Sequence, residues 1–145
     1  MKPARFALCL ALILAAVAWL LPVMPAHAGL VVIRVTPQGS TGWPCGDTWQ
    51  AACDLQVALA HAAAGDEIWI AAGTYTPTGG ADRTVSFQLR DGVDLYGGFA
   101  GVESARDERD WTLYPTILSG DLGIPGDPSD NSYHVLLSSD LDAGL

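Results

Sequence analysis

Three aspartates in one loop are the residues of this chain whose types most clearly suit a chemical task. The segment GDLGIPGDPSDN, residues 120–131, contains Asp121, Asp127 and Asp130. Carboxylate oxygens are the ligands that Ca²⁺ prefers, so the three aspartates are candidate cation-binding residues. Their spacing matches neither the EF-hand loop nor the glycine–aspartate repeat of calcium-binding β-rolls. The alternative prediction is a solvated loop that binds no ion.

A second charged segment, ARDERDW, spans residues 105–111. Arg106 and Arg109 lie among three acidic residues, and two guanidinium groups in such a setting are candidates for binding a sugar acid. The alternative is a solvated loop with local ion pairs, which contribute little to stability. We expect Trp111 to anchor this loop onto the body of the protein.

The sequence contains no recognisable catalytic motif. His61 and His134 have no Ser or Cys partner nearby in the sequence, so a catalytic triad is not predicted. The segment GGFAG, residues 97–101, lacks the Lys-Ser/Thr pair and the following helix that a phosphate-binding loop needs. We therefore predict no catalytic residue.

The first 28 residues have the pattern of a secretory signal peptide. Lys2 and Arg5 precede a continuous apolar run, residues 6–21, and Ala26-His27-Ala28 forms a small-x-small cleavage site. We predict cleavage after Ala28 and a mature domain of residues 29–145. An uncleaved membrane anchor is the alternative, although the apolar run is shorter than the ~20 residues of a typical span.

Loss of the signal peptide makes an acidic chain more acidic. It leaves five arginines and all 16 acidic residues, which changes the formal net charge from -9 to -11. Such a surface repels phosphate backbones and anionic lipids, so nucleic acid is not expected as a partner. The charge suits an exported, solvated protein or one that binds cations.

Two cysteines, Cys45 and Cys53, remain after cleavage. In an oxidising compartment a pair at this spacing predicts a local disulfide. Free thiols and a metal site are the alternatives, and the metal site would have only Asp47 and Asp54 as further ligands nearby. A disulfide here would close a short loop at the start of a helix.

One helix and several short strands are predicted along the mature chain. The helix covers residues 54–64, with Asp54 as its cap, Gly65 at its end and an apolar stripe of Leu55, Ala58, Leu59 and Ala62. A strand is expected before it at 30–35 and a turn-rich loop at 37–47. Further short strands are expected at the segments 67–71, 85–89, 92–97, 115–121 and 133–137.

The spacing of these strands predicts the fold class. Comparable segments begin at Ile68, Val93, Ile117 and Val135, and each ends near Gly or Asp. Short strands recurring in this way suggest the coils of a parallel β-solenoid, in which glycines form the corners. On this view the strand in GVDLYGGFAG, residues 92–101, ends at its glycines, and Phe99 packs back over the coil. In the solenoid the helix would cap the first coil. A β-sandwich is the competing prediction.

Several blocks of the chain together resemble one group of proteins. The resemblance is to the N-terminal region of secreted bacterial proteins with a right-handed parallel β-helix, the pectin-lyase-like fold, many of which are adhesin-like surface proteins related to polymorphic outer-membrane proteins. The blocks that carry it are WQAACDLQVAL (49–59), GDEIWIAAGTY (65–75), GVDLYGGFAG (92–101), RDW (109–111), PTILSGD (115–121) and DNSYHV (130–135).

The resemblance implies an all-β fold, a right-handed parallel β-helix whose N-terminal part carries a short amphipathic capping helix. It implies a non-catalytic portion of an exported surface or adhesin-like protein, located outside the cell or on the bacterial outer membrane, with polysaccharides or host glycans as candidate partners. The alternative is the N-terminal part of a polysaccharide lyase or glycoside hydrolase, with its active site on later coils. No catalytic residue is carried over, and Ca²⁺ is the one candidate cofactor.

Family members usually run for several hundred residues, so we expect this chain to be truncated at its C-terminus. A complete, small secreted binding module is the alternative. The last coil would leave an open edge able to self-associate. Membrane contact is expected only through an anchor outside this sequence.

Overall fold

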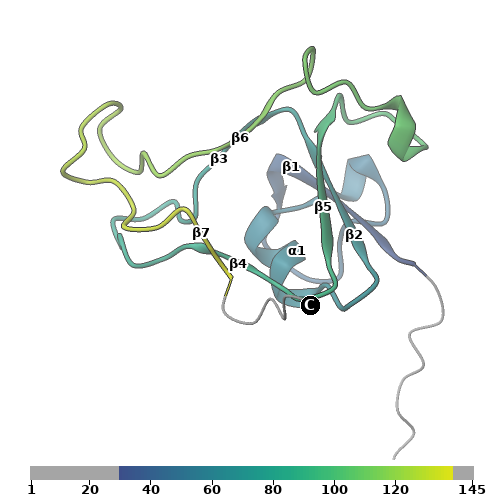
Figure 1. The fold of residues 1–145 in the computed structure, drawn as a ribbon, viewed down its shortest axis with the longest axis horizontal. Helices are drawn as coiled ribbons and strands as arrows, with labels where there is room; N and C mark the ends of the chain where they lie inside the picture. The colour runs from purple at the N-terminus through teal and green to yellow at the C-terminus, as the bar shows by residue number, and fades with distance from the viewer. Residues whose placement is uncertain (1–29, 139–145) are drawn as a thin grey trace, which may run out of the picture.

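A computed structural model describes residues 30–138 of the chain (Figure 1). The predicted signal peptide, its cleavage site and residues 139–145 lie outside this range. Within the described range, no helix combines the length and apolar character needed to cross a membrane.

Seven short strands form three parallel sheets in the described residues. The first sheet has the order β1-β2-β5, the second joins β3 to β6, and the third joins β4 to β7. The strands are β1 (Val32–Ser40), β2 (Glu67–Ala71), β3 (Gly73–Tyr75), β4 (Phe87–Leu89), β5 (Asp94–Phe99), β6 (Thr116–Leu118) and β7 (Leu136–Ser138).

The chain passes through the three sheets twice in the same order. Strands β2, β3 and β4 form the first circuit, and β5, β6 and β7 form the second (Figure 1). Each strand of the second circuit pairs in parallel with the strand three places earlier. The two circuits therefore lie one upon the other.

The predicted equivalence of Ile68, Val93, Ile117 and Val135 holds for the first two segments, which form the paired strands β2 and β5, and is wrong for the other two. Ile68 pairs with Leu95, Ile117 pairs with Thr74, and the segment at Val135 leads into a strand that pairs with β4. The apolar segments recur at similar intervals, yet they belong to three different sheets. Loops of unequal length connect them, so the interval between segments does not equal the interval between paired strands.

Inward-facing side chains from the sheets and the helix form one apolar core. Ile33 and Ile68 are directly paired and buried, and Val35 and Ile70 repeat this two residues later because successive strand residues face opposite sides. Phe87 of β4 and Leu55 of the helix complete the core. Burial of each such large side chain contributes about 1.5–3 kcal/mol relative to exposure.

Helix α1 (Leu55–His61) is shorter than predicted. The Asp54 side chain caps it by accepting a bond of 2.8 Å from the Gln56 backbone N–H, as predicted. The predicted end at residue 64 is wrong, because the Asp66 carboxylate accepts a bond of 2.9 Å from the Ala63 N–H and turns the chain towards β2. The predicted apolar stripe, Leu55, Ala58, Leu59 and Ala62, is buried.

Helix α1 packs against β1 and against β4, the last strand of the first circuit. The Gln56 side-chain amide donates to the carbonyls of Pro77 and Ser86, at 2.7 and 3.2 Å. Ser86 immediately precedes β4, which pairs with β7 and with no other strand of the described chain. The helix thus supplies hydrogen bonds on the side of the first circuit where no strand does.

The segment before α1 is fastened to β1. Cys45 and Cys53 form a disulfide with a Cα–Cα distance of 5.2 Å, the pairing expected from their spacing. Part of the predicted 37–47 loop is strand instead, since β1 runs to Ser40. The reason is that Ser40 continues the ladder, with its N–H on the Ala52 carbonyl at 2.8 Å and its carbonyl accepting from Asp54 at 2.9 Å.

The Gln56 bonds predict a stability difference between two glutamine variants. Gln56→Ala leaves two carbonyls beside β4 without their amide donor and should lower the free energy of unfolding by about 1–3 kcal/mol. Gln50→Ala is the control, because Gln50 is exposed. Urea unfolding followed by circular dichroism measures both. Equal stability of the two variants would show that α1 does not cap the first circuit in this way.

Candidate functional site

The outer face of the first sheet carries a row of charged and aromatic side chains. Arg34 of β1 pairs with Trp69 of β2, and Trp69 pairs with Tyr96 of β5. The Arg34 guanidinium lies 5.4 Å from the Trp69 ring centre and 5.8 Å from that of Trp49, distances at which a cation is attracted to an aromatic face. The row is therefore a feature of strand register, and no local motif encodes it.

The segment that follows β5, residues 100–111, folds back over this row and is called the covering segment here. Phe99 is fully buried, as predicted, and its ring stacks on Trp69 with centres 4.9 Å apart. The Trp49 indole N–H donates to the Glu103 carbonyl at 2.8 Å. Only 4% of Trp69 remains exposed. A second, smaller apolar cluster thus lies outside the sheet.

A long-range ion pair holds this segment in place. Arg106, in the 3₁₀ helix η2 (Arg106–Glu108), pairs with the buried Glu67 carboxylate at 2.7 Å. Glu67 also accepts a bond of 2.7 Å from the Trp69 indole. The prediction of purely local ion pairs in the charged loop is wrong for Arg106, because folding brings β2 beneath the loop. Arg106 is thus committed to a structural contact.

Glu103 shapes the turn that begins the covering segment. Its carboxylate accepts backbone N–H bonds from Ala100, Gly101 and Val102, at 2.6, 2.9 and 2.9 Å. Burial opposes ionisation of Glu103, but the backbone N–H bonds outweigh burial and lower its pKa below the ordinary 4.5. The turn therefore depends on an ionised carboxylate.

Arg109 and Trp111 lie at the end of the covering segment, beside an open hollow of about 330 Å³. Trp111 is 67% exposed, so the prediction that it anchors the loop is wrong. Asp110 makes the anchoring contact instead, because its backbone N–H donates to the Gly98 carbonyl at 2.8 Å. The lining residues are Gly97, Gly98, Arg109, Trp111, Pro115 and Thr116.

The glycines of β5 permit this close approach. The predicted strand end at the glycines is wrong, because β5 continues to Phe99 with a register shift between Ile70 and Ala71 of its partner. Gly98 has φ +94, and a Cβ there would lie 2.9 Å from the backbone of Trp111. Any other residue at this position would be strained and would collide with the covering segment.

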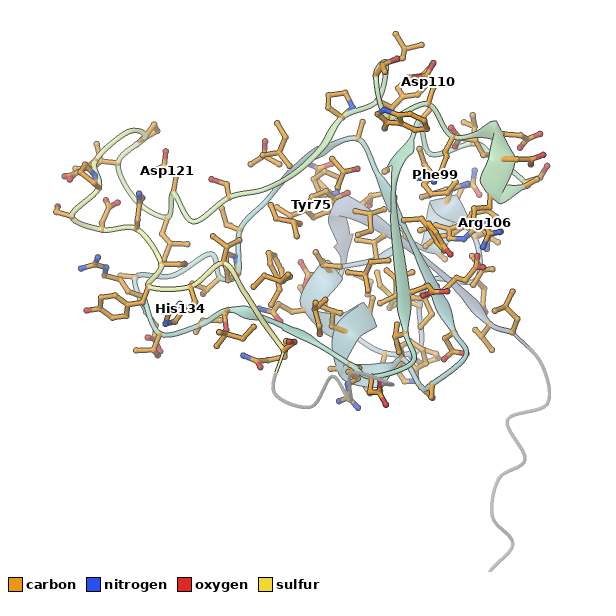
Figure 2. All side chains as sticks on the ribbon, viewed as in Figure 1. Tyr75, Phe99, Arg106, Asp110, Asp121 and His134 are labelled. Atoms are coloured by element: carbon orange, nitrogen blue, oxygen red, sulfur yellow. A yellow bond between two sulfur atoms is a disulfide. The ribbon has the colours of Figure 1, made fainter. Side chains whose placement is uncertain are left out.

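The acidic loop lies at the opposite end of the molecule from Arg106 (Figure 2). Asp121, Asp127 and Asp130 each accept a backbone N–H from within the loop, from Gly126, Ser129 and Ile124 at 2.9, 2.8 and 2.7 Å. These bonds use one oxygen of each carboxylate to shape turns.

Further oxygens in this loop are buried and accept no bond from the described residues. They belong to Asp121, Asp130, Asn131 and Ser132. Even so, the described residues contain no group of three or more His, Cys, Asp or Glu side chains placed to share a metal ion. Cation binding by Asp121, Asp127 and Asp130 stays a prediction.

Both histidines of the described region are exposed, as expected for His61. The His61 ring stacks on Trp43 with centres 4.4 Å apart and planes 9° apart. Trp43 itself is 46% exposed, so this stacked pair lies at the surface. No sequence pattern announces this pair, because the two residues come from separate elements.

Comparison of the chain with family models, with curated proteins and with solved structures finds no match. The family resemblance drawn from the sequence blocks therefore stays a prediction, and the site must be interpreted from its own geometry.

The Glu103 turn predicts a pH-dependent stability difference. The lowered pKa means that ionised Glu103 stabilises the fold fully above about pH 4.5, and that this contribution disappears as the pH falls through the folded-state value. Glu103→Gln should therefore be less stable than wild type at pH 7, by about 1–3 kcal/mol, with the gap closing towards pH 3.

Thermal unfolding of both proteins between pH 3 and 7 measures this gap. Asp107→Asn is the matched control, since Asp107 is exposed. A gap that persists unchanged at pH 3, or an equal effect of Asp107→Asn, would contradict the assigned Glu103 contacts.

Proposed function

We propose that this chain forms the N-terminal cap and first coils of an exported right-handed parallel β-helix of the surface or adhesin-like kind, without catalytic activity. The observation that carries the proposal is the repeated parallel pairing of β2 with β5, β3 with β6 and β4 with β7. Strands that pair in the same order on successive circuits are what a parallel solenoid requires.

Helix α1 supports the capping part of the proposal. A stack of coils exposes unpaired backbone groups at its first edge, and such an edge would pair with other chains. Helix α1 buries Leu55 and Leu59 against the core, and Gln56 bonds the carbonyls of Pro77 and Ser86. Both contacts are of the kind that a terminal cap needs.

The carboxylates support a non-catalytic function. Side-chain and backbone hydrogen bonds lower the pKa of Asp110 and of Asp127, and backbone bonds lower the pKa of Glu108. A general acid needs the opposite shift, towards the operating pH. These acids hold loops in shape, which suits a scaffold that presents loops to partners.

Glycans are the proposed partners, and the outer surface of a bacterial cell is the proposed location. The signal-peptide pattern supports export, and the exposed Trp111 supplies an aromatic surface on a presented loop. The second circuit also leaves Ile117, Leu136 and Leu137 exposed beside strand edges that pair with nothing in the described chain. Those edges are proposed to pair with further strands or with another copy.

An antibody raised against residues 30–138 tests this function on the native product. We expect the antigen to be labelled on intact source cells and to be removed by added protease, while a cytoplasmic marker stays protected. Antigen captured from the cells should be retained on immobilised glycans without releasing reducing ends or unsaturated sugars. A purely cytoplasmic antigen would contradict the proposal, and product release would favour the lyase or hydrolase alternative.

A further inference from the structure

Arg109 retains most of its hydrogen-bonding capacity. The single ion pair among the described residues joins Arg106 to Glu67. The other arginines of the mature chain each donate to a backbone carbonyl, and that bond is short for Arg34, Arg83 and Arg90, at 2.7, 2.6 and 2.9 Å. The Arg109 bond, to the Gly97 carbonyl, is 3.3 Å long. Its guanidinium thus makes the longest of these hydrogen bonds and no ion pair.

Two aromatic rings orient this guanidinium. It lies 5.2 Å from the ring centre of Tyr96 and 5.7 Å from that of Trp111. The nearby carboxylates already have partners: Asp94 accepts from the Tyr96 hydroxyl at 3.3 Å, and Asp110 accepts from Thr112 at 2.6 and 2.9 Å. Arg109 forms no ion pair with a described carboxylate and is therefore a positioned cation without a direct charged partner.

Trp111 is exposed on a turn that several internal hydrogen bonds hold. One Asp110 carboxylate oxygen accepts the N–H of Thr112, the hydroxyl of Thr112 and the N–H of Leu113. The Tyr114 N–H closes the turn on the Asp110 carbonyl at 2.8 Å. A ligand that packs on Trp111 therefore meets a preorganised loop and loses little affinity to ordering it.

We propose that Arg109 and Trp111 form a binding subsite for a glycan that carries a single carboxylated sugar. The Arg109 guanidinium pairs with the carboxylate, because two of its N–H groups can donate parallel hydrogen bonds to the two carboxylate oxygens. The apolar face of the sugar ring packs on Trp111, above a hollow that Thr116 also lines. This assignment rests on the proposed glycan-binding function and names its ligand class.

The net charge of the chain disfavours a ligand that carries several carboxylates. A mature net charge of -11 repels densely charged polyanions, and the subsite offers one uncommitted cation. A largely neutral glycan with one acidic sugar satisfies Arg109 without that long-range repulsion. Polyuronates and sulfated polymers are expected to bind more weakly.

Titration of the purified mature chain, followed by tryptophan fluorescence and calorimetry, tests the subsite with three probes. Sialyllactose has one carboxylate, lactose has none and trigalacturonate has three. We expect sialyllactose to bind at least 10-fold more tightly than lactose, a difference of about 1.4 kcal/mol, and more tightly than trigalacturonate. Arg109→Gln should remove this preference and leave lactose binding unchanged, whereas Trp111→Ala should weaken both.

Arg83→Gln and Tyr133→Ala are the matched controls, because Arg83 lies 4.5 Å from the ring centre of the exposed Tyr133. They should leave all three affinities unchanged, and thermal unfolding checks that every variant is folded. Arg109→Lys keeps the positive charge but loses the paired N–H donors of the guanidinium, and it should bind sialyllactose with intermediate affinity.

Equal affinity for lactose and sialyllactose, strongest binding of trigalacturonate, or an unaltered preference in folded Arg109→Gln would each overturn the subsite. If neutral glycans bind without an acidic preference, the subsite fails while the proposed glycan-binding function stands. If the native antigen also binds no glycan, both fail.

Discussion

Parallel pairing between successive circuits of the chain is the constraint on which the rest of the structure depends. Ile33, Ile68 and Leu95 stand in one register, so a single apolar row runs through the first sheet. A shift by one residue would send that row to the outer face. The same pairing leaves backbone N–H and C=O groups without a hydrogen-bond partner at either end of the described stack, where there is no neighbouring strand. Helix α1, its Asp54 cap and the Gln56 amide occupy the side of the first circuit where strands are missing.

The register that builds the core also builds the outer face. While Ile68 points inward, Trp69 points outward between Arg34 and Tyr96. The segment from Phe99 onward covers this row, tied by the Arg106–Glu67 pair and the Glu103 turn. Its end projects Trp111 into solvent next to Arg109. The carboxylates of Glu103, Glu108 and Asp110 shape turns in these loops, and Arg109 and Trp111 are the groups proposed to meet a ligand.

Local features of the fold were predictable from the sequence, whereas long-range ones were not. The bounds of β2, the Asp54 cap, the apolar stripe of α1 and the Cys45–Cys53 pair each depend on neighbouring residues, and the structure agrees with them. The equivalence of the Ile117 and Val135 segments to the first two was mispredicted, because similar apolar segments recur in three sheets. Trp111 and Arg106 were mispredicted for a related reason: their environments depend on which strand lies beneath the loop. A single sequence carries no direct signal for such contacts.

Engineered disulfides between outward-facing residues test the stacking of the two circuits most directly. Thr74 pairs with Ile117 and Gln88 pairs with Leu137, and all four side chains are exposed. We expect the Cys pairs at 74/117 and 88/137 each to crosslink on oxidation of the purified protein, whereas the crossed pairs 74/137 and 88/117 should not. Efficient crosslinking of the crossed pairs, or none in the matched pairs, would contradict the parallel stacking and the proposed β-helix with it.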